Sequence, residues 1–75
     1  MTTLVYFYPS VTYNKQPLVL NVAYIKEMTP SYDGKEVCYL CIHGTEYATQ
    51  INLPLDVVVR ALKGDDIVGI KLIKV

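Results

Sequence analysis

The chain opens with its longest unbroken apolar run. Residues 4–8 (Leu-Val-Tyr-Phe-Tyr) contain no polar side chain that would define a solvent-facing side. This pattern is typical of a strand covered on both faces. We expect the strand over 3–8, ended by Pro9, with a turn over 11–16.

Alternating apolar positions predict a second strand over 18–28. Pro17 is compatible with it, because the first residue of a strand need not donate a ladder hydrogen bond. Asn21 interrupts the alternation, so two shorter strands also fit. Asp33 and Gly34 form the strongest hairpin signal in the chain, and we expect a turn there.

Two further strands are expected over 36–43 and 46–53, separated by a turn at Gly44. Between Tyr47 and Asn52, alternate residues fall on opposite faces of the predicted strand. The last strand is expected over 67–75, with hydrophobic residues on both of its faces.

One short helix is predicted between the fourth and last strands. Asn52 or Leu53 is the expected cap, Pro54 suits the first helical residue, and Gly64 is a natural stop. Three consecutive valines at 57–59 are poor helix formers, so burial must override their propensity. The apolar stripe at helical spacing consists of Leu55, Val58, Ala61 and Leu62.

The predicted order is β-β-β-β-α-β in a single domain over 1–75. We expect an α+β fold with a small, largely antiparallel sheet of about five strands and one short helix. The sheet is either open or curled into a partly open barrel. One short helix covers only one face of the first strand, so a second copy, a partner protein or the chain's own strands must cover the other.

Composition points to contacts beyond the domain itself. Hydrophobic residues make up 52% of the 75 residues and charged residues 19%. A domain this small buries only about 60% of the surface of its unfolded chain. Tyrosine tolerates partial exposure and is enriched at interfaces, although it also packs well on two-sided sheets. From the seven tyrosines we select these as expected exposed binding anchors: Tyr6, Tyr8, Tyr13 and Tyr24.

Charge disfavours nucleic acid as the main partner. The seven basic and seven acidic residues give a net charge of zero, and the basic residues are spread along the whole chain. Phosphate binding needs concentrated positive charge. Stacked tyrosines can still hold a single strand, which leaves that alternative open. The N-terminus lacks signal-peptide features and no apolar run could span a bilayer, so we expect a cytoplasmic protein without membrane contact.

The two cysteines lie three apart within one predicted strand. Cys38 and Cys41 would therefore point to opposite faces, and His43 is the one histidine in the chain. We expect buried free thiols and no metal or cofactor; zinc shared across a dimer is the alternative. A Cys41–His43 pair with Glu36 or Glu46 nearby is a conceivable catalytic dyad, although a strand-end histidine is more often a plain surface residue.

The remaining motifs give no catalytic assignment. Asp65 and Asp66 lack the alternating acids, central glycine and closing glutamate of a calcium loop. The glycines form no phosphate-binding loop, and no Ser-His-Asp set is identifiable. We therefore expect no catalytic residues and no enzymatic activity.

The layout over 18–62 resembles the small flagellar-regulator family FlbD. The residues that carry this resemblance are the strand entry 24–28 (Tyr-Ile-Lys-Glu-Met) and the helix segment 58–62 (Val-Val-Arg-Ala-Leu). It covers under two-thirds of the chain and rests on hydrophobic spacing. The resemblance implies a non-enzymatic regulatory binder. The expected function is thus a protein-binding or self-assembling module, a regulator or inhibitor of a partner; the alternative is a single-stranded nucleic-acid binder.

Overall fold

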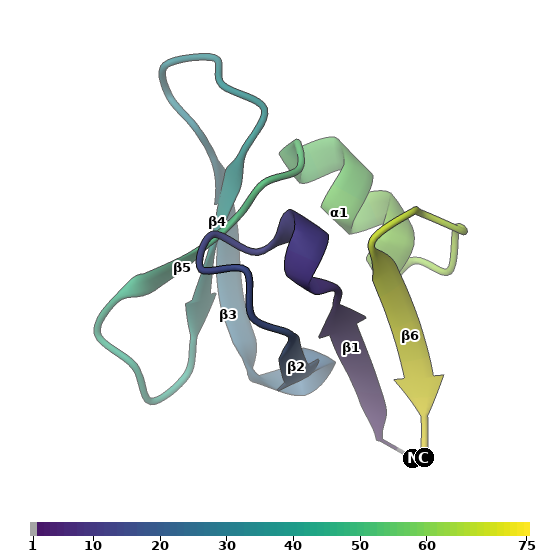
Figure 1. Cartoon of the computed structure of the whole chain (residues 1–75). Helices are drawn as coiled ribbons and strands as arrows, with labels where there is room; N and C mark the ends of the chain where they lie inside the picture. Colours follow the sequence, from purple (N-terminus) through teal and green to yellow (C-terminus); the bar gives the residue numbers. More distant parts are fainter. Residues whose placement is uncertain (1) are drawn as a thin grey trace.

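The computed structural model describes residues 2–75 and shows a small α+β fold (Figure 1). Every strand pair in it is antiparallel, as predicted. The elements are β1 (Thr3–Phe7), η1 (Pro9–Val11), β2 (Leu18–Asn21), η2 (Val22–Tyr24), β3 (Ile25–Pro30), β4 (Cys38–Ile42), β5 (Ala48–Ile51), α1 (Leu55–Leu62) and β6 (Ile70–Lys74).

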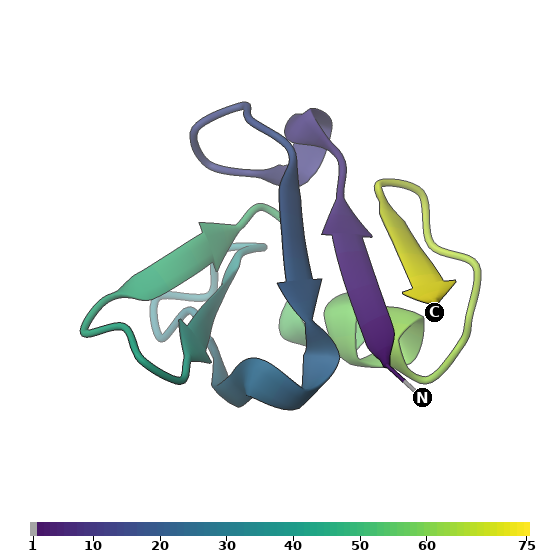
Figure 2. The ribbon, with the colours of Figure 1, turned by 90° about the horizontal axis from the view of Figure 1, so that it is seen from below.

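The strands form two sheets, which corrects the expectation of one five-stranded sheet. The first sheet has the order β2-β1-β6 and the second the order β3-β4-β5. The predicted second strand is divided at Asn21, whose side chain accepts a hydrogen bond from the Ala23 N–H at 2.9 Å. This contact favours a 3-10 turn at η2 over continued strand. The chain then passes from one sheet to the other (Figure 2).

The expected alternative, one sheet curled into a partly open barrel, is not what the described residues form: they form two separate sheets and no closed barrel. In the described part of the chain, one isolated bridge, Thr12 to Ile51, joins the first turn to the edge of β5. The Asn52 N–H donates to the Val11 carbonyl at 2.7 Å beside it. Beyond this point β5 and the first sheet do not pair, so a seam remains between the two sheets.

Strand β1 is the centre of the first sheet, with two distinct faces. Val5 and Phe7 have no exposed surface, whereas Leu4 and Tyr6 on the opposite face are partly exposed. Helix α1 lies behind β1 and β6 and covers the inner face (Figure 2). The expectation that one helix can cover only one face of this strand is confirmed.

The core lies between the two sheets and the helix. Burial of each large apolar side chain stabilises the fold by about 1.5–3 kcal/mol. The predicted helix stripe is inside: Val58 and Ala61 are buried, and Leu55 and Leu62 pack against the core. The buried set is Val5, Phe7, Val11, Cys38, Leu40, Ile51, Val58, Ala61 and Ile70.

The helix ends nearly where the sequence predicts. Pro54 occupies the N-cap position, one residue before the first helical residue, and Asp56 lies in the first turn. Gly64, just past the helix, has φ +109°, a conformation that side chains rarely adopt. Burial of the stripe therefore outweighs the low helix propensity of the three valines.

A second glycine has φ +97° and lies against the core. The carbonyl of Gly69 accepts a hydrogen bond from the Tyr8 N–H at 2.9 Å, which extends the β1–β6 ladder. A Cβ on Gly69 would lie 2.5 Å from Cγ1 of Val11. This position has no room for a side chain.

The two ends of the described chain lie side by side (Figure 1). Thr2 donates to the Val75 carbonyl at 3.2 Å, and Val75 donates to the Thr2 carbonyl at 2.9 Å. Among residues 2–75, no helix is both long and apolar enough to cross a membrane.

Candidate binding surfaces

The outer face of the first sheet is apolar, and no helix or strand among residues 2–75 covers it. Side chains alternate along each strand, so the residues opposite one another on this face follow from the strand register. None of its apolar residues belongs to the core or packs against it. The outer face consists of Leu4, Tyr6, Tyr8, Val19, Asn21, Lys71 and Ile73.

An aromatic pair lies at the end of this face. The rings of Tyr6 and Tyr8 are 4.9 Å apart between centroids and meet edge to face at 84°. Tyr8 is 43% exposed and Val19 on the neighbouring strand is 50% exposed. An edge-to-face pair holds both rings in fixed orientations, so little side-chain entropy remains to be lost on binding.

A separate groove lies at the seam between the two sheets. Its volume is about 460 Å³, and none of its lining residues is charged. Three tyrosine rings and three side-chain amides line it. The lining residues are Thr12, Tyr13, Asn14, Gln16, Pro17, Leu18, Tyr39, Tyr47, Ala48, Thr49 and Gln50.

The four tyrosines selected from the sequence fall into three places. Tyr6 and Tyr8 share the outer face, whereas Tyr13, which is 71% exposed, lines the groove. Tyr24 is 59% exposed on η2, and its carbonyl accepts from the His43 N–H at 2.8 Å. These four side chains therefore do not form one surface.

Two groove tyrosines were not among the selected residues. Tyr39 lies on the face of β4 opposite the buried Cys38 and Leu40, and Tyr47 lies just before β5. Strand alternation places Tyr39 on the outward face of β4. That pattern cannot place the first turn against β5, because this contact joins segments distant in sequence.

The cysteines point to opposite sides of β4, as predicted. Cys38 has no exposed surface, and burial raises the pKa of its thiol to about 11. Both thiols are free, but Cys41 is partly exposed, so the expectation of buried thiols is confirmed for Cys38 alone. Within residues 2–75, no hydrogen bond joins the His43 imidazole to Cys41 or an acid, and no three His, Cys, Asp or Glu residues cluster as metal ligands. At neutral pH the Cys38 thiol is therefore protonated and lacks the thiolate character of a nucleophile.

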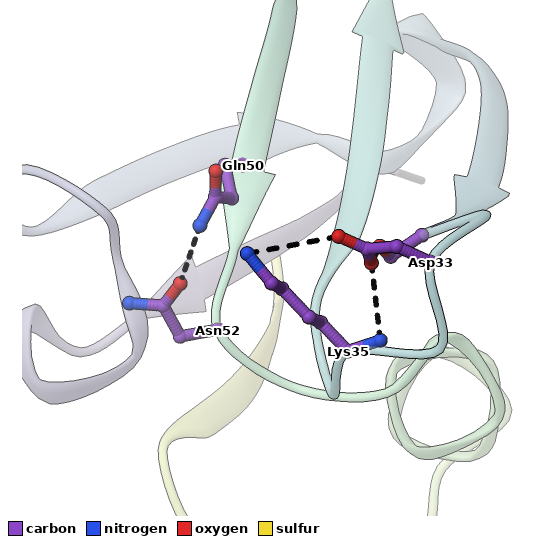
Figure 3. Close-up of polar contacts among 5 residues, drawn as sticks. Asp33, Lys35, Gln50 and Asn52 are labelled. Carbon is purple, nitrogen blue, oxygen red and sulfur yellow. Dashed lines mark hydrogen bonds and ion pairs between the residues drawn. The ribbon is translucent and has the colours of Figure 1, made fainter.

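The polar side-chain contacts near the second sheet join residues that are close in sequence (Figure 3). Asp33 accepts from the Ser31 hydroxyl and from the Lys35 N–H, and the Ser31 bond in particular lowers the pKa of its carboxyl group. The Gln50 amide donates to Oδ1 of Asn52 at 2.9 Å. The Asp33 contacts order the predicted hairpin turn, while the Gln50–Asn52 bond orients an amide that lines the groove.

Comparison of the chain with family models, curated proteins and solved structures finds no match. The resemblance to the FlbD family therefore has no support from a family match. The outer face and the groove are two candidate binding surfaces of the chain.

Proposed function

We propose that this chain is a non-enzymatic protein-binding module whose outer face docks on another protein. The observation that carries the proposal is the uncovered apolar face of the first sheet, with its fixed Tyr6–Tyr8 pair. Exposed contiguous apolar patches on small domains mark interaction sites. Aromatic side chains also dominate the affinity of many protein interfaces.

The size of the outer face suits the centre of an interface. Three strands about 4.8 Å apart and four or five residues long, at about 3.3 Å per residue, give a projected area of roughly 220 Å². A standard interface buries about 800 Å² on each partner. The outer face thus supplies an apolar centre, around which a polar rim would complete the contact.

Charge favours a different protein over a second copy as the occupant. Within the described residues, Lys71 is the one charged side chain that the register places on the outer face. Two copies meeting face to face would place two Lys71 side chains in one interface, and neither outer face has a carboxylate to pair with them. A partner with an apolar patch and a carboxylate opposite Lys71 is complementary, so we infer that chemistry for the partner.

The alternative, a single-stranded nucleic-acid binder, has less support. The tyrosine pair could stack on bases, but one lysine on the face provides little phosphate neutralisation. This alternative predicts strongly salt-dependent binding of an oligonucleotide. Binding of a protein by a mainly apolar face predicts weak salt dependence.

The test compares Tyr8→Ala with a matched control, Tyr32→Ala. Tyr32 is fully exposed in the β3–β4 turn and lies away from the outer face. After a partner has been captured and purified, Tyr8→Ala is expected to weaken its affinity by about tenfold or more, since hot-spot residues typically contribute that much. Tyr32→Ala is expected to leave the affinity unchanged, and both variants keep their melting temperatures within a few degrees.

Two results would count against this function. Equal loss of affinity in both variants would show that binding is not specific to the outer face. A dimer seen by light scattering that Tyr8→Ala dissociates would identify a second copy as the occupant and remove the case for a carboxylate-bearing partner.

A further inference from the structure

The β1–β6 ladder fixes which backbone groups of β6 point away from the first sheet. At one end of the ladder, Gly69 accepts from the Tyr8 N–H at 2.9 Å. At the other end, Val75 exchanges two hydrogen bonds with Thr2. The register between these pairs is unbroken, so the odd-numbered residues of β6 bond to β1. The even-numbered residues therefore direct their N–H and C=O groups outward.

The outward groups belong to Ile70, Leu72 and Lys74. The Ile70 N–H donates to the Ile67 carbonyl at 3.2 Å. Within residues 2–75, no other hydrogen bond reaches the outward groups of these three residues. In the described chain β6 is the last strand of the order β2-β1-β6, at the rim of the first sheet (Figure 2). It thus presents an open strand edge, which can pair with another strand.

Both signs of charge lie beside this edge. Lys74, Asp65 and Asp66 line one pocket of about 390 Å³ along β6. The Asp65 carboxylate forms an ion pair with Arg60 at 3.2 Å. Among the described residues, Asp66 and Lys74 form no ion pair. Each chain therefore offers one unused cation and one unused anion next to its open edge.

From the open edge and these two charges, we propose that two copies of the chain pair through β6 as antiparallel strands, with Leu72 opposite Leu72. The two Leu72 residues then exchange their outward N–H and C=O groups. The Lys74 N–H of each copy donates to the Ile70 carbonyl of the other, because the two-fold axis repeats every contact. The two β2-β1-β6 sheets become one continuous sheet.

The side chains are self-complementary in this register. Lysines on an edge strand usually prevent pairing. Here Lys71 lies opposite Ile73 of the second copy, so the lysines do not face one another. Lys74 lies opposite Ile70 of the second copy, which lines the same pocket as Asp66. Two Lys74–Asp66 pairs therefore form across the axis, which favours a second copy as the occupant of the edge.

This contact is separate from the proposed docking of another protein on the outer face. Tyr6 and Tyr8 lie on that face, whereas the dimer uses the backbone edge of β6. Tyr8→Ala is therefore expected to leave the dimer intact. Failure of the dimer can thus be distinguished from failure of the outer face.

The experiment measures the dimer dissociation constant of the full chain by analytical ultracentrifugation, at concentrations up to about 1 mM. We expect a reversible dimer for the wild type. Lys74→Glu and Asp66→Lys should each weaken it by about tenfold or more, because each variant alone brings like charges together twice. An equimolar mixture of the two variants should form a mixed dimer about as tight as the wild type, since both pairs then join opposite charges.

The matched control is Lys71→Glu. It makes the same charge change on the same strand, but at a position that faces Ile73 of the second copy and no acid. This variant should keep the dissociation constant of the wild type within about threefold, as a charge without a close partner contributes little. Lys74, Asp66 and Lys71 are all exposed, so the variants should fold normally.

A second measurement uses the wild type alone. Hydrogen exchange at the outward Leu72 amide should slow as the protein concentration rises through the dissociation constant. Exchange at the Ile73 amide, which already bonds to β1, should change little.

Four outcomes would overturn the proposal. A chain that stays monomeric at about 1 mM has no β6 dimer of measurable affinity. A dimer that Lys74→Glu does not weaken, or that the mixture of variants does not restore, lacks the Lys74–Asp66 pairs. Leu72 exchange that is independent of concentration would place the contact elsewhere.

Discussion

Substitution of Gly69 by alanine tests how the first sheet packs on the first turn. The backbone at Gly69 has φ +97°, and an added Cβ would lie 2.5 Å from Cγ1 of Val11. The positive φ costs roughly 1–2 kcal/mol for a residue with a side chain. Val11 is 8% exposed and β-branched, so it cannot easily rotate away, and overpacking adds about 1–3 kcal/mol. Gly69→Ala should therefore lower the free energy of unfolding by about 2–5 kcal/mol.

Gly64→Ala is the matched control. Gly64 has φ +109°, but nothing lies within 4 Å of an added Cβ there. This variant should cost only the backbone contribution of about 1–2 kcal/mol. Since a loss of 1 kcal/mol lowers the melting temperature of a domain of this size by about 4–8 °C, the two variants should be readily separated.

The free energies of unfolding are measured by urea denaturation of four variants: Gly69→Ala, Gly64→Ala, Val11→Ala and the Gly69→Ala/Val11→Ala double variant. Removal of both Cγ atoms of Val11 should relieve the overlap and give a favourable coupling of about 0.5–3 kcal/mol. A Gly69→Ala cost no larger than that of Gly64→Ala would contradict a steric overlap at Gly69. Additive effects of Gly69→Ala and Val11→Ala would also contradict it, because no overlap would then exist to relieve.

Two further predictions concern Cys38 and Asn21. Burial raises the pKa of the Cys38 thiol from 9.0 to about 11 in the folded protein. The protonated thiol therefore contributes stability that is fully present below pH 9 and is lost as the pH rises to 11. The free energy of unfolding should fall by about 2–3 kcal/mol over this range. Unfolding free energies of wild type and Cys38→Ala from pH 8 to 11 should show the wild type falling more steeply, and parallel curves would contradict the assignment. Asn21→Ala removes the acceptor for the Ala23 N–H and should cost about 0.5–2 kcal/mol in urea denaturation, whereas Asn21→Asp, which keeps a side-chain oxygen, should cost less.

Local patterns in the sequence predicted most of the elements. The hairpin at Asp33 and Gly34, the helix stop at Gly64 and the orientation of Cys38 all follow from residue-level rules, and the structure confirms them. The predicted strands were too long at their ends, because regular pairing stops where the chain turns, whatever the side-chain pattern of the next residues. The observed strand 38–42, for example, is shorter than the predicted 36–43.

The arrangement in space was less predictable. The sequence allows the second strand to divide at Asn21 but does not require it. In the structure, the hydrogen bond from the Ala23 N–H to the Asn21 side chain divides this strand in two, and the two parts belong to different sheets. The groove depends on a contact between Thr12 and Ile51, which lie far apart in the chain. Periodicity within a segment carries no information about which distant segment it meets, so the grouping of Tyr13 with Tyr39 and Tyr47 could not be predicted.

The pairing of β1 with β6 has a consequence for how fast the domain folds. The central strand of the first sheet forms its ladder with residues 70–74 from the other end of the chain. Loop-closure entropy must be overcome before such contacts stabilise the fold, so proteins dominated by distant pairings fold slowly. A short glycine-serine linker from Val75 to Thr2, with the chain reopened at Gly34, would make β6 and β1 a local hairpin. Such a circular permutant would keep the native contacts and fold faster than the original chain. The folding rate of this domain can therefore be changed by joining its adjacent ends.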